Sequence, residues 1–272
     1  MRQSKMQNLQ RAAWCLVLAL GLAPVSAHAF GIDDFDEADT PNQLFRLSGP
    51  GGTELTPRMT QDSVGGVLGG ERDLMVLVAD LPAGVNPLPN ALMGAIGRPT
   101  VGLLEIATSG KYGSQVHLQY DGEDAVNGGE PGNPIVDVLG LGGVDLSDGG
   151  TSDRFRFNIV SAQSQDGVAL EVAITVHGQG DGIATAAGFA PDSLSPSFYD
   201  LMFSEFQYAN GGTFATVLQS ARSITFIFNP NSVPNADFQI DSIVTVPEPS
   251  TLALLGMAGV AGVVYRLRKR RA

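Results

Sequence analysis

Carboxylates in glycine-rich loops are the residues of this chain most suited to chemistry. Asp121, Glu123 and Asp124 open the stretch DGEDAVNGGEPGNP, residues 121–134. Calcium takes roughly six to eight oxygen ligands, which converge easily in such a loop. The spacing does not match the D-x-D-x-D-G pattern of an EF-hand, and turn-forming Asp and Gly on a solvated surface are the commoner alternative. The loop is a candidate calcium site, and no other cofactor is predicted.

A second acidic, glycine-rich stretch holds Asp145, Asp148 and Asp153. It permits the same two interpretations, a calcium site or solvated turns. Carboxylates are so numerous elsewhere that a glycosidase acid pair could lie in many places, and nothing in the sequence singles one out. We therefore name no catalytic residue.

Histidines and cysteine add little to this chemistry. The histidines are His28, His117 and His177, and their spacing does not fit a metal site. No G-x-S-x-G nucleophile elbow occurs. Cys15 lies in an apolar N-terminal run that we expect to be removed, so the mature chain would have neither a disulfide nor a catalytic thiol. The sequence predicts that the protein is not an enzyme.

Charge is distributed unevenly along the 272 residues. The segment 30–246 holds 27 acidic and 8 basic residues, a net charge of −19, whereas both ends are basic. A domain this acidic repels phosphate backbones, which argues against nucleic acid as a partner. The abundant glycine and proline, 34 and 16 residues, favour a fold with many turns.

The N-terminus has the features of a signal peptide. Basic residues precede an apolar run over residues 14–23, and Ala27 and Ala29 form an A-x-A cleavage site. Signal peptidase should therefore cleave before Phe30 and remove residues 1–29. The alternative, a buried helix of the fold, explains neither the basic flank nor the cleavage site.

The C-terminus combines a short apolar segment with a basic tail. A helix over residues 250–265 would be about 24 Å long at ~1.5 Å per residue, slightly shorter than a hydrocarbon core of ~30 Å. Flanking arginines that snorkel would still let it cross. The positive-inside rule keeps the tail cytoplasmic and the acidic domain outside. The basic residues of the tail are Arg266, Arg268, Lys269, Arg270 and Arg271.

Three features in this order are specific: Pro247, Glu248 and Pro249, then a Gly/Leu/Ala-rich segment, then the arginine cluster. Together they resemble the PEP-CTERM sorting signal, here residues 247–272. The resemblance implies recognition and processing by exosortase, a membrane transpeptidase-like protease of Gram-negative bacteria that often make exopolysaccharide or biofilm. The tripeptide would act as a recognition element. Its prolines favour an extended, accessible Glu248.

The segment 30–246 contains short strand-like runs separated by turn residues. They predict about nine or ten strands in one antiparallel β-sandwich of jelly-roll type. The runs cover residues 73–79, 101–107, 115–120, 154–160, 168–176, 213–218, 223–228 and 238–244.

Several short elements of this segment are similar to those of other PEP-CTERM ectodomains. They are VLGGERDL at residues 67–74, YDGED at 120–124, VDLS at 144–147, FSEF at 203–206 and IDSI at 240–243. The similarity implies a jelly-roll sandwich like that of carbohydrate-binding modules and does not identify a ligand. Tyr120 stands where the pattern usually has Trp.

Three functions stay open at this point. The first is a structural or adhesive protein of the cell envelope, the cell surface or an extracellular exopolysaccharide matrix. The second is a lectin-like carbohydrate-binding module, although the mature chain would lack tryptophan because its single Trp14 is in the signal peptide. The third is a secreted glycan hydrolase with an acid pair that the sequence does not reveal.

Overall fold

The computed structural model describes residues 29–36, 45–46, 58–61, 66–78, 92–93, 102–107, 114–122, 140–164, 167, 169–233 and 236–247. Residues 29–246 cluster into one compact unit. Nearly all of the predicted signal peptide, and the predicted helix 250–265 with its basic tail, lie outside the described residues. Within the described part of the chain, no helix has the length and apolarity needed to cross a membrane.

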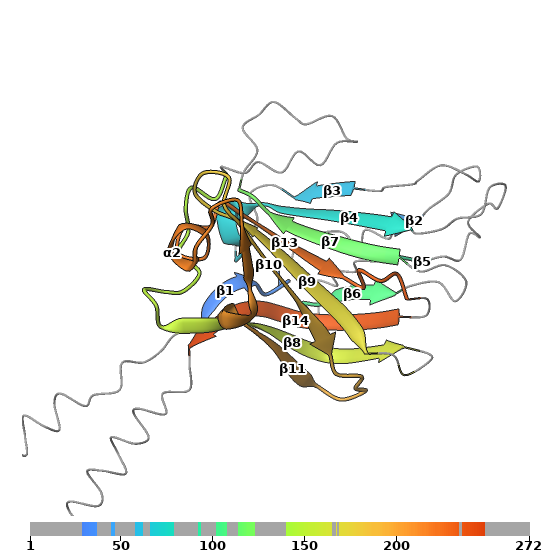
Figure 1. Cartoon of the computed structure of the whole chain (residues 1–272). Helices are drawn as coiled ribbons and strands as arrows, with labels where there is room; N and C mark the ends of the chain where they lie inside the picture. Colours follow the sequence, from blue (N-terminus) through green and yellow to red (C-terminus); the bar gives the residue numbers. More distant parts are fainter. Residues whose placement is uncertain are drawn as a thin grey trace, which may run out of the picture. The chain divides into compact units, whose positions relative to one another are not determined.

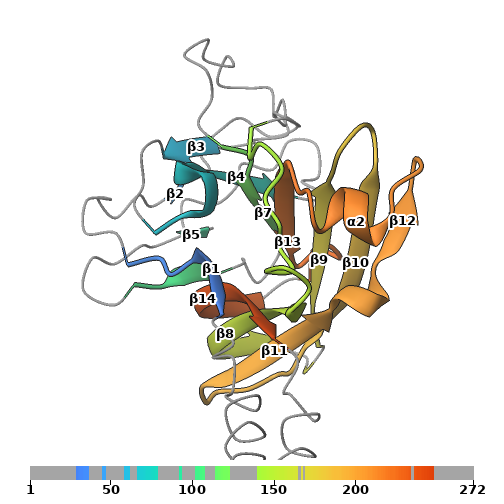
Figure 2. The same ribbon diagram turned by 90° about the vertical axis from the view of Figure 1, so that its left-hand side faces the viewer.

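Two antiparallel sheets face each other across a common core (Figures 1 and 2). The five-stranded sheet has the order β1 (Phe30–Asp33), β14 (Ala236–Pro247), β8 (Ser152–Ser164) and β11 (Ser197–Met202), with β6 (Leu104–Ala107) also paired to β14. The seven-stranded sheet has the order β12 (Gln207–Ala209), β10 (Ile183–Ala190), β9 (Leu170–His177), β13 (Ser223–Phe228), β7 (Ser114–Tyr120), β4 (Arg72–Val78) and β3 (Arg58–Gln61). The short strands β2 (Phe45–Arg46) and β5 (Leu92–Met93) pair with each other.

The core lies between the sheets because their strands alternate buried and half-exposed side chains. In β9 this alternation is unbroken from Leu170 to His177. Rings from the two sheets meet edge to face in the centre, where Phe155 of β8 and Phe226 of β13 have centroids 5.7 Å apart. The predicted all-β, antiparallel, jelly-roll-like sandwich is confirmed.

Residues 213–218 were predicted as a strand, and this prediction is wrong. They form the short helix α2 (Phe214–Val217), with Thr213 as its N-cap. The Thr213 hydroxyl accepts a hydrogen bond from the backbone N–H of Thr216, and the Thr216 hydroxyl in turn accepts one from the backbone N–H of Thr213. This reciprocal capping gives the β-branched run a helical start.

Two short 3₁₀ turns complete the described elements. The first, η1 (Leu68–Gly70), leads into β4, and the second, η2 (Phe203–Glu205), follows β11. Glu205 accepts a hydrogen bond from the backbone N–H of Met202 at 2.9 Å. Phe203 and Phe206 are buried beside Phe155, so the FSEF element serves packing.

Candidate functional site

A buried ion pair joins the two sheets and fixes the start of β4 against the end of β7. Asp33 of β1 accepts two hydrogen bonds from the Arg72 guanidinium, each 2.6 Å long. It also accepts one from the Tyr120 hydroxyl at 2.5 Å and one from the backbone N–H of Phe35 at 2.9 Å. The Arg72 guanidinium lies 5.0 Å from the centre of the Phe35 ring. We call Asp33, Arg72 and Tyr120 the inter-sheet clamp.

Burial shapes the electrostatics of the clamp. Desolvation raises the pKa of Asp33 to about 6, although Arg72, Tyr120 and the Phe35 amide each oppose this shift. Burial, and next the charge of Asp33, also raise the pKa of Tyr120 well above its ordinary value. At neutral pH the carboxylate is therefore ionised beside its arginine, while Tyr120 stays a neutral donor.

The residues on either side of Arg72, and the residue after Tyr120, point away from the core between the sheets. Because successive side chains of a strand alternate, Arg72 turns inward while Glu71 and Asp73 turn to the outer side. The same alternation turns Tyr120 inward and Asp121 outward. The register pairs Asp73 with Gln119, which brings the VLGGERDL and YDGED elements side by side.

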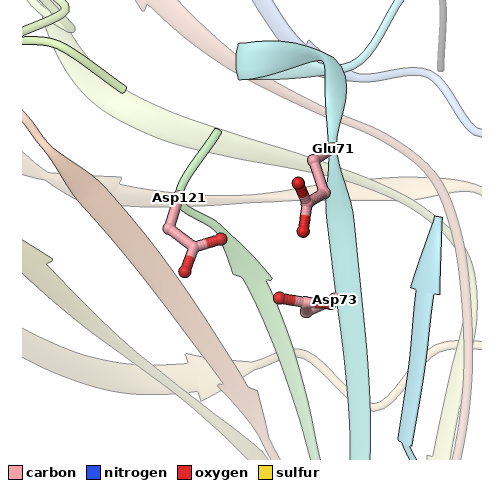
Figure 3. Close-up of side chains that lie close together, drawn as sticks. All are labelled: Glu71, Asp73 and Asp121. Atoms are coloured by element: carbon pink, nitrogen blue, oxygen red, sulfur yellow. The ribbon is translucent and has the colours of Figure 1, made fainter. Parts of the chain in front are cut away.

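Glu71, Asp73 and Asp121 meet as a carboxylate cluster (Figure 3). One ligand oxygen from each residue lies within 4.8 Å of the others, and Glu71 and Asp121 are buried while Asp73 is half-buried. Gln119 donates a hydrogen bond to Asp121 Oδ2 at 2.7 Å. Among the residues that the structure describes, this is the one group of carboxylates, histidines or cysteines that could hold a metal ion.

Glycine allows the backbone to close around Asp121. Gly122 has φ +85°, and a Cβ there would meet the carbonyl oxygen of Gly140 at 2.4 Å. A Cβ on Gly140 would lie 1.4 Å from the carbonyl oxygen of Asp121. The loop at Gly140 thus rests directly on Asp121, the residue after β7, and no larger residue than glycine fits this approach.

The donor set of the cluster suits a hard divalent cation. Two oxygens bound to one Ca²⁺ at ~2.4 Å are at most about 4.8 Å apart, so the observed spacing fits a shared ion. Carboxylates this close repel one another, and a cation between them would relieve that repulsion. The cluster is where calcium would bind, and it includes Asp121 of the loop predicted from sequence.

The structure describes only some of the other predicted loop residues. Glu123 and Asp124 lie outside the described residues. Asp145 accepts hydrogen bonds from the backbone N–H groups of Ser147 at 2.9 Å and Gly149 at 3.0 Å, so it shapes a turn. Asp153 pairs with Arg154 at 2.7 Å. The interpretation as a turn residue fits Asp145, whereas Asp153 lies in β8.

Both histidines of the folded segment lie on the seven-stranded sheet. His117 is half-buried on β7, with Nε2 3.2 Å from the side-chain oxygen of Gln115. Burial lowers the pKa of both His117 and His177, which favours their neutral forms.

Of the residues predicted to direct processing, Ala29 and Pro247 are described. Ala29 is exposed and directly precedes β1, and Pro247 is the last residue of β14. Ala27, Glu248, Pro249 and the basic tail lie outside the described residues, and their roles stay predictions.

A comparison with protein families supports the resemblance found at the C-terminal end. The family model of the PEP-CTERM protein-sorting motif matches residues 245–271. The chain is therefore a PEP-CTERM sorting-domain protein. The motif implies an exported protein that exosortase processes, with a cell-envelope or surface location. No curated protein is significantly similar to the chain.

Solved structures offer distant likenesses. The family 11 carbohydrate-binding module of the cellulase Lic26A-Cel5E of Clostridium thermocellum is 14% identical, with a TM-score of 0.35 over 82% of this chain and 96% of that one. The same kind of module in complex with a β-1,3-1,4-mixed-linked tetrasaccharide is 15% identical, with a TM-score of 0.33 over 80% of this chain and 95% of that one. An exo-β-agarase is 12% identical, with a TM-score of 0.32 over 81% of this chain and 25% of that one. Likenesses this weak carry no conclusion about ligand or activity.

Proposed function

We propose that the protein is a structural or adhesive component of an exopolysaccharide matrix at the cell surface. The PEP-CTERM sorting motif at residues 245–271 carries this proposal. The acidic, turn-rich sandwich is compatible with it, because a domain with a net charge of −19 stays soluble after export. The proposal includes no catalytic activity.

The matrix role is tested by locating the processed protein and removing it. Matrix material extracted from a producing culture should contain the processed chain, and cells that lack the chain should attach or flocculate less. A processed chain found only in the culture fluid, with unchanged attachment of the deletion strain, would argue against the proposal.

A lectin-like module is the second candidate, and a polar row across the seven-stranded sheet favours it. The register places Thr185 opposite Thr175 and Thr175 opposite Thr225. These side chains share the outer face, where neighbouring strands lie ~4.8 Å apart. An aligned row of hydroxyl groups can hydrogen-bond a neutral glycan chain.

Binding of the purified processed protein to a panel of polysaccharides tests this second candidate. Thr175→Val and Thr225→Val keep the side-chain shape while removing hydroxyls from the row, so they should weaken any glycan binding. Thr151→Val removes an exposed hydroxyl in the loop before β8 and serves as the control. Equal glycan affinity of all three variants would place the binding site outside this row. No binding to any polysaccharide would dismiss the lectin-like candidate.

A glycan hydrolase is the remaining alternative, and the carboxylate cluster defines its test. Glycosidases use two carboxyl groups, one as an acid and one as a nucleophile or base. Release of reducing ends from polysaccharides, abolished by Glu71→Gln or Asp121→Asn, would support hydrolysis. We expect no release with the unmodified protein.

A further inference from the structure

An exposed aromatic ring lies on the outer face of the five-stranded sheet. Three large apolar side chains among the described residues are more than half exposed: Phe189, Leu194 and Phe198. Phe198 belongs to β11, which ends the strand order of the five-stranded sheet (Figure 1). Its neighbour Tyr199 stacks on the buried ring of Phe157, so the alternation of side chains turns Phe198 away from the core. Phe198 is thus 57% exposed on a regular strand.

Charged groups hold the Phe198 ring in one orientation. The Arg156 guanidinium carbon lies 4.3 Å from the centre of the ring. Arg156 in turn donates two hydrogen bonds to the Asp200 carboxylate, from Nε to Oδ1 and from Nη2 to Oδ2, each 2.7 Å long. Asp200 stands opposite Arg156 in the register of β8 and β11, so backbone pairing fixes this ion pair. One face of the ring is covered by a fixed cation, and the other is available to a ligand.

Uncharged polar groups continue this surface across the sheet. Asn158 of β8 stands opposite Phe198, and its Nδ2 donates a hydrogen bond to Ser242 Oγ of β14 at 2.8 Å. The ring, the amide and the hydroxyl lie on three neighbouring strands, which together span ~10 Å at ~4.8 Å per strand. We call Phe198, Arg156, Asn158 and Ser242 the ring surface.

The charges around the ring surface favour an uncharged ligand. Arg154 and Arg156 are each paired with an aspartate, so neither offers an unbalanced positive charge. The net charge of −19 on residues 30–246 repels anionic polymers and opposes the docking of a second copy. A sugar ring presents weakly positive C–H groups, which pack on the negative face of an aromatic ring. Its hydroxyls form hydrogen bonds with amide and hydroxyl groups.

We propose that the ring surface binds an uncharged polysaccharide of the matrix, with sugar units stacked on Phe198. This inference rests on the proposed matrix function and adds a ligand class and a binding surface to it. The threonine row of the lectin-like candidate belongs to the other sheet, so the two surfaces are tested separately. Phe198 contacts the ligand, whereas Arg156 and Asp200 are positioning residues, because they fix the ring.

Phe198→Ala and Phe189→Ala form a matched pair of variants. Each removes a phenylalanine of nearly equal exposure, 57% and 59%, one from β11 and one from β10 of the other sheet. Calorimetry on the processed protein measures affinity for the uncharged fraction of the producing culture's exopolysaccharide, isolated by anion exchange. Phe198→Ala should weaken binding at least about tenfold, whereas Phe189→Ala and Phe198→Tyr should change it less than about twofold. Equal losses for the two alanine variants, or no binding by the unmodified protein, overturn the inference.

A second pair of variants tests how the ring is positioned. Arg156→Met removes the guanidinium that lies against Phe198, and Arg154→Met removes the adjacent arginine of the same strand. Arg156→Met should weaken polysaccharide binding about threefold, and Arg154→Met should leave it unchanged. Affinity is measured well below Tm, where a role in stability alone would not change it. Unchanged affinity of Arg156→Met would overturn its positioning role.

Matrix extraction separates this inference from the proposed function. The unmodified protein should be recovered with the matrix and Phe198→Ala should be depleted from it. Equal recovery of both, with equal affinity, overturns the inference alone, whereas absence of the unmodified protein from the matrix overturns the matrix role and the inference with it. Sedimentation velocity tests the remaining occupant, a second copy. If Phe198→Ala dissociates a dimer and leaves polysaccharide binding unchanged, the ring surface is an interface between copies and the inference is wrong.

Discussion

At the scale of single residues, the inter-sheet clamp sets a buried charge against a buried counter-charge. The side chains of Asp33 and Arg72 are almost closed to water, so each depends on the other for solvation. Such a pair adds little to stability as a whole, but loss of one partner leaves a buried charge uncompensated.

Removing the arginine of the clamp should be costly. Arg72→Met leaves the Asp33 carboxylate buried without its counter-charge, and we expect a loss of about 3–5 kcal/mol in the free energy of unfolding near neutral pH. Urea denaturation measures it. Arg154→Met, which removes a more exposed ion pair with Asp153 and Asp200, should cost about 1 kcal/mol or less. Similar losses for both variants would contradict the proposed role of the clamp.

The raised pKa of Asp33 predicts a pH dependence of stability. Its pKa is about 6 in the folded chain against an ordinary 3.8, so the folded state binds the proton more tightly than the unfolded state. The resulting stabilisation is fully present below about pH 4 and is lost as the pH rises through about 6. The stability advantage of wild type over Asp33→Asn should shrink by up to about 3 kcal/mol from pH 4 to pH 7. A constant difference would disprove the shift.

The carboxylate cluster predicts stabilisation by calcium. Extracellular sites bind calcium with Kd near ~10⁻³–10⁻⁴ M, so about 10 mM should raise Tm by about 3–8 °C. Sodium chloride of equal ionic strength controls for screening. Glu71→Gln and Asp73→Asn should abolish the rise, whereas Asp181→Asn in an exposed turn should keep it. No rise, or an equal rise in all variants, would remove the calcium site.

Sequence patterns identified one member of this cluster. Asp121 stands out because it begins a long acidic, glycine-rich loop. Glu71 and Asp73 belong to an ordinary strand start, and their proximity to Asp121 depends on the β4–β7 register. Alternation within VLGGERDL would have placed them on one face, but pairing between distant strands is not visible in one sequence.

At the scale of elements, the loop at Gly140 packs tightly against the backbone of Asp121, just after β7. Gly140→Ala would force a Cβ to within 1.4 Å of the Asp121 carbonyl oxygen, so the backbone must move. We expect a loss of at least about 1–3 kcal/mol in chemical denaturation. Gly31→Ala is the control, because its Cβ would meet nothing within 4 Å. If Gly140→Ala proves as stable as Gly31→Ala, the described approach is wrong.

Strands with strong β-branched or aromatic alternation could be predicted from the sequence. β8 (RFRFNIV) and β13 (SITFIF) are clear examples, because one face of each must be buried. β10 (IATAAGFA) was missed, since alanine and glycine carry no strand signal and its pairing to β9 supplies its stability. Residues 213–218 were wrongly predicted as a strand, because a reciprocal threonine cap overrides their strand propensity and starts a helix.

At the scale of the whole molecule, the predicted signal-peptidase site and the sorting motif adjoin the first and last strands of the sandwich. β1 and β14 lie together, and the matched motif begins within β14. The signal-peptide pattern predicted export, charge composition predicted an acidic domain, and the family match supports the sorting signal. The pairing of β1 with β14 could not be predicted, because the first and last strands are far apart in sequence.

Removing the sorting signal tests the central claim most directly. A chain that ends at Val246 and a full-length chain, produced in hosts with and without the exosortase, are followed by fractionation into membrane, surface and medium. The account predicts a full-length chain that is processed only with exosortase and stays with the membrane without it, and a truncated chain that enters the medium in both hosts. Identical fractionation of the two chains, independent of exosortase, would contradict it.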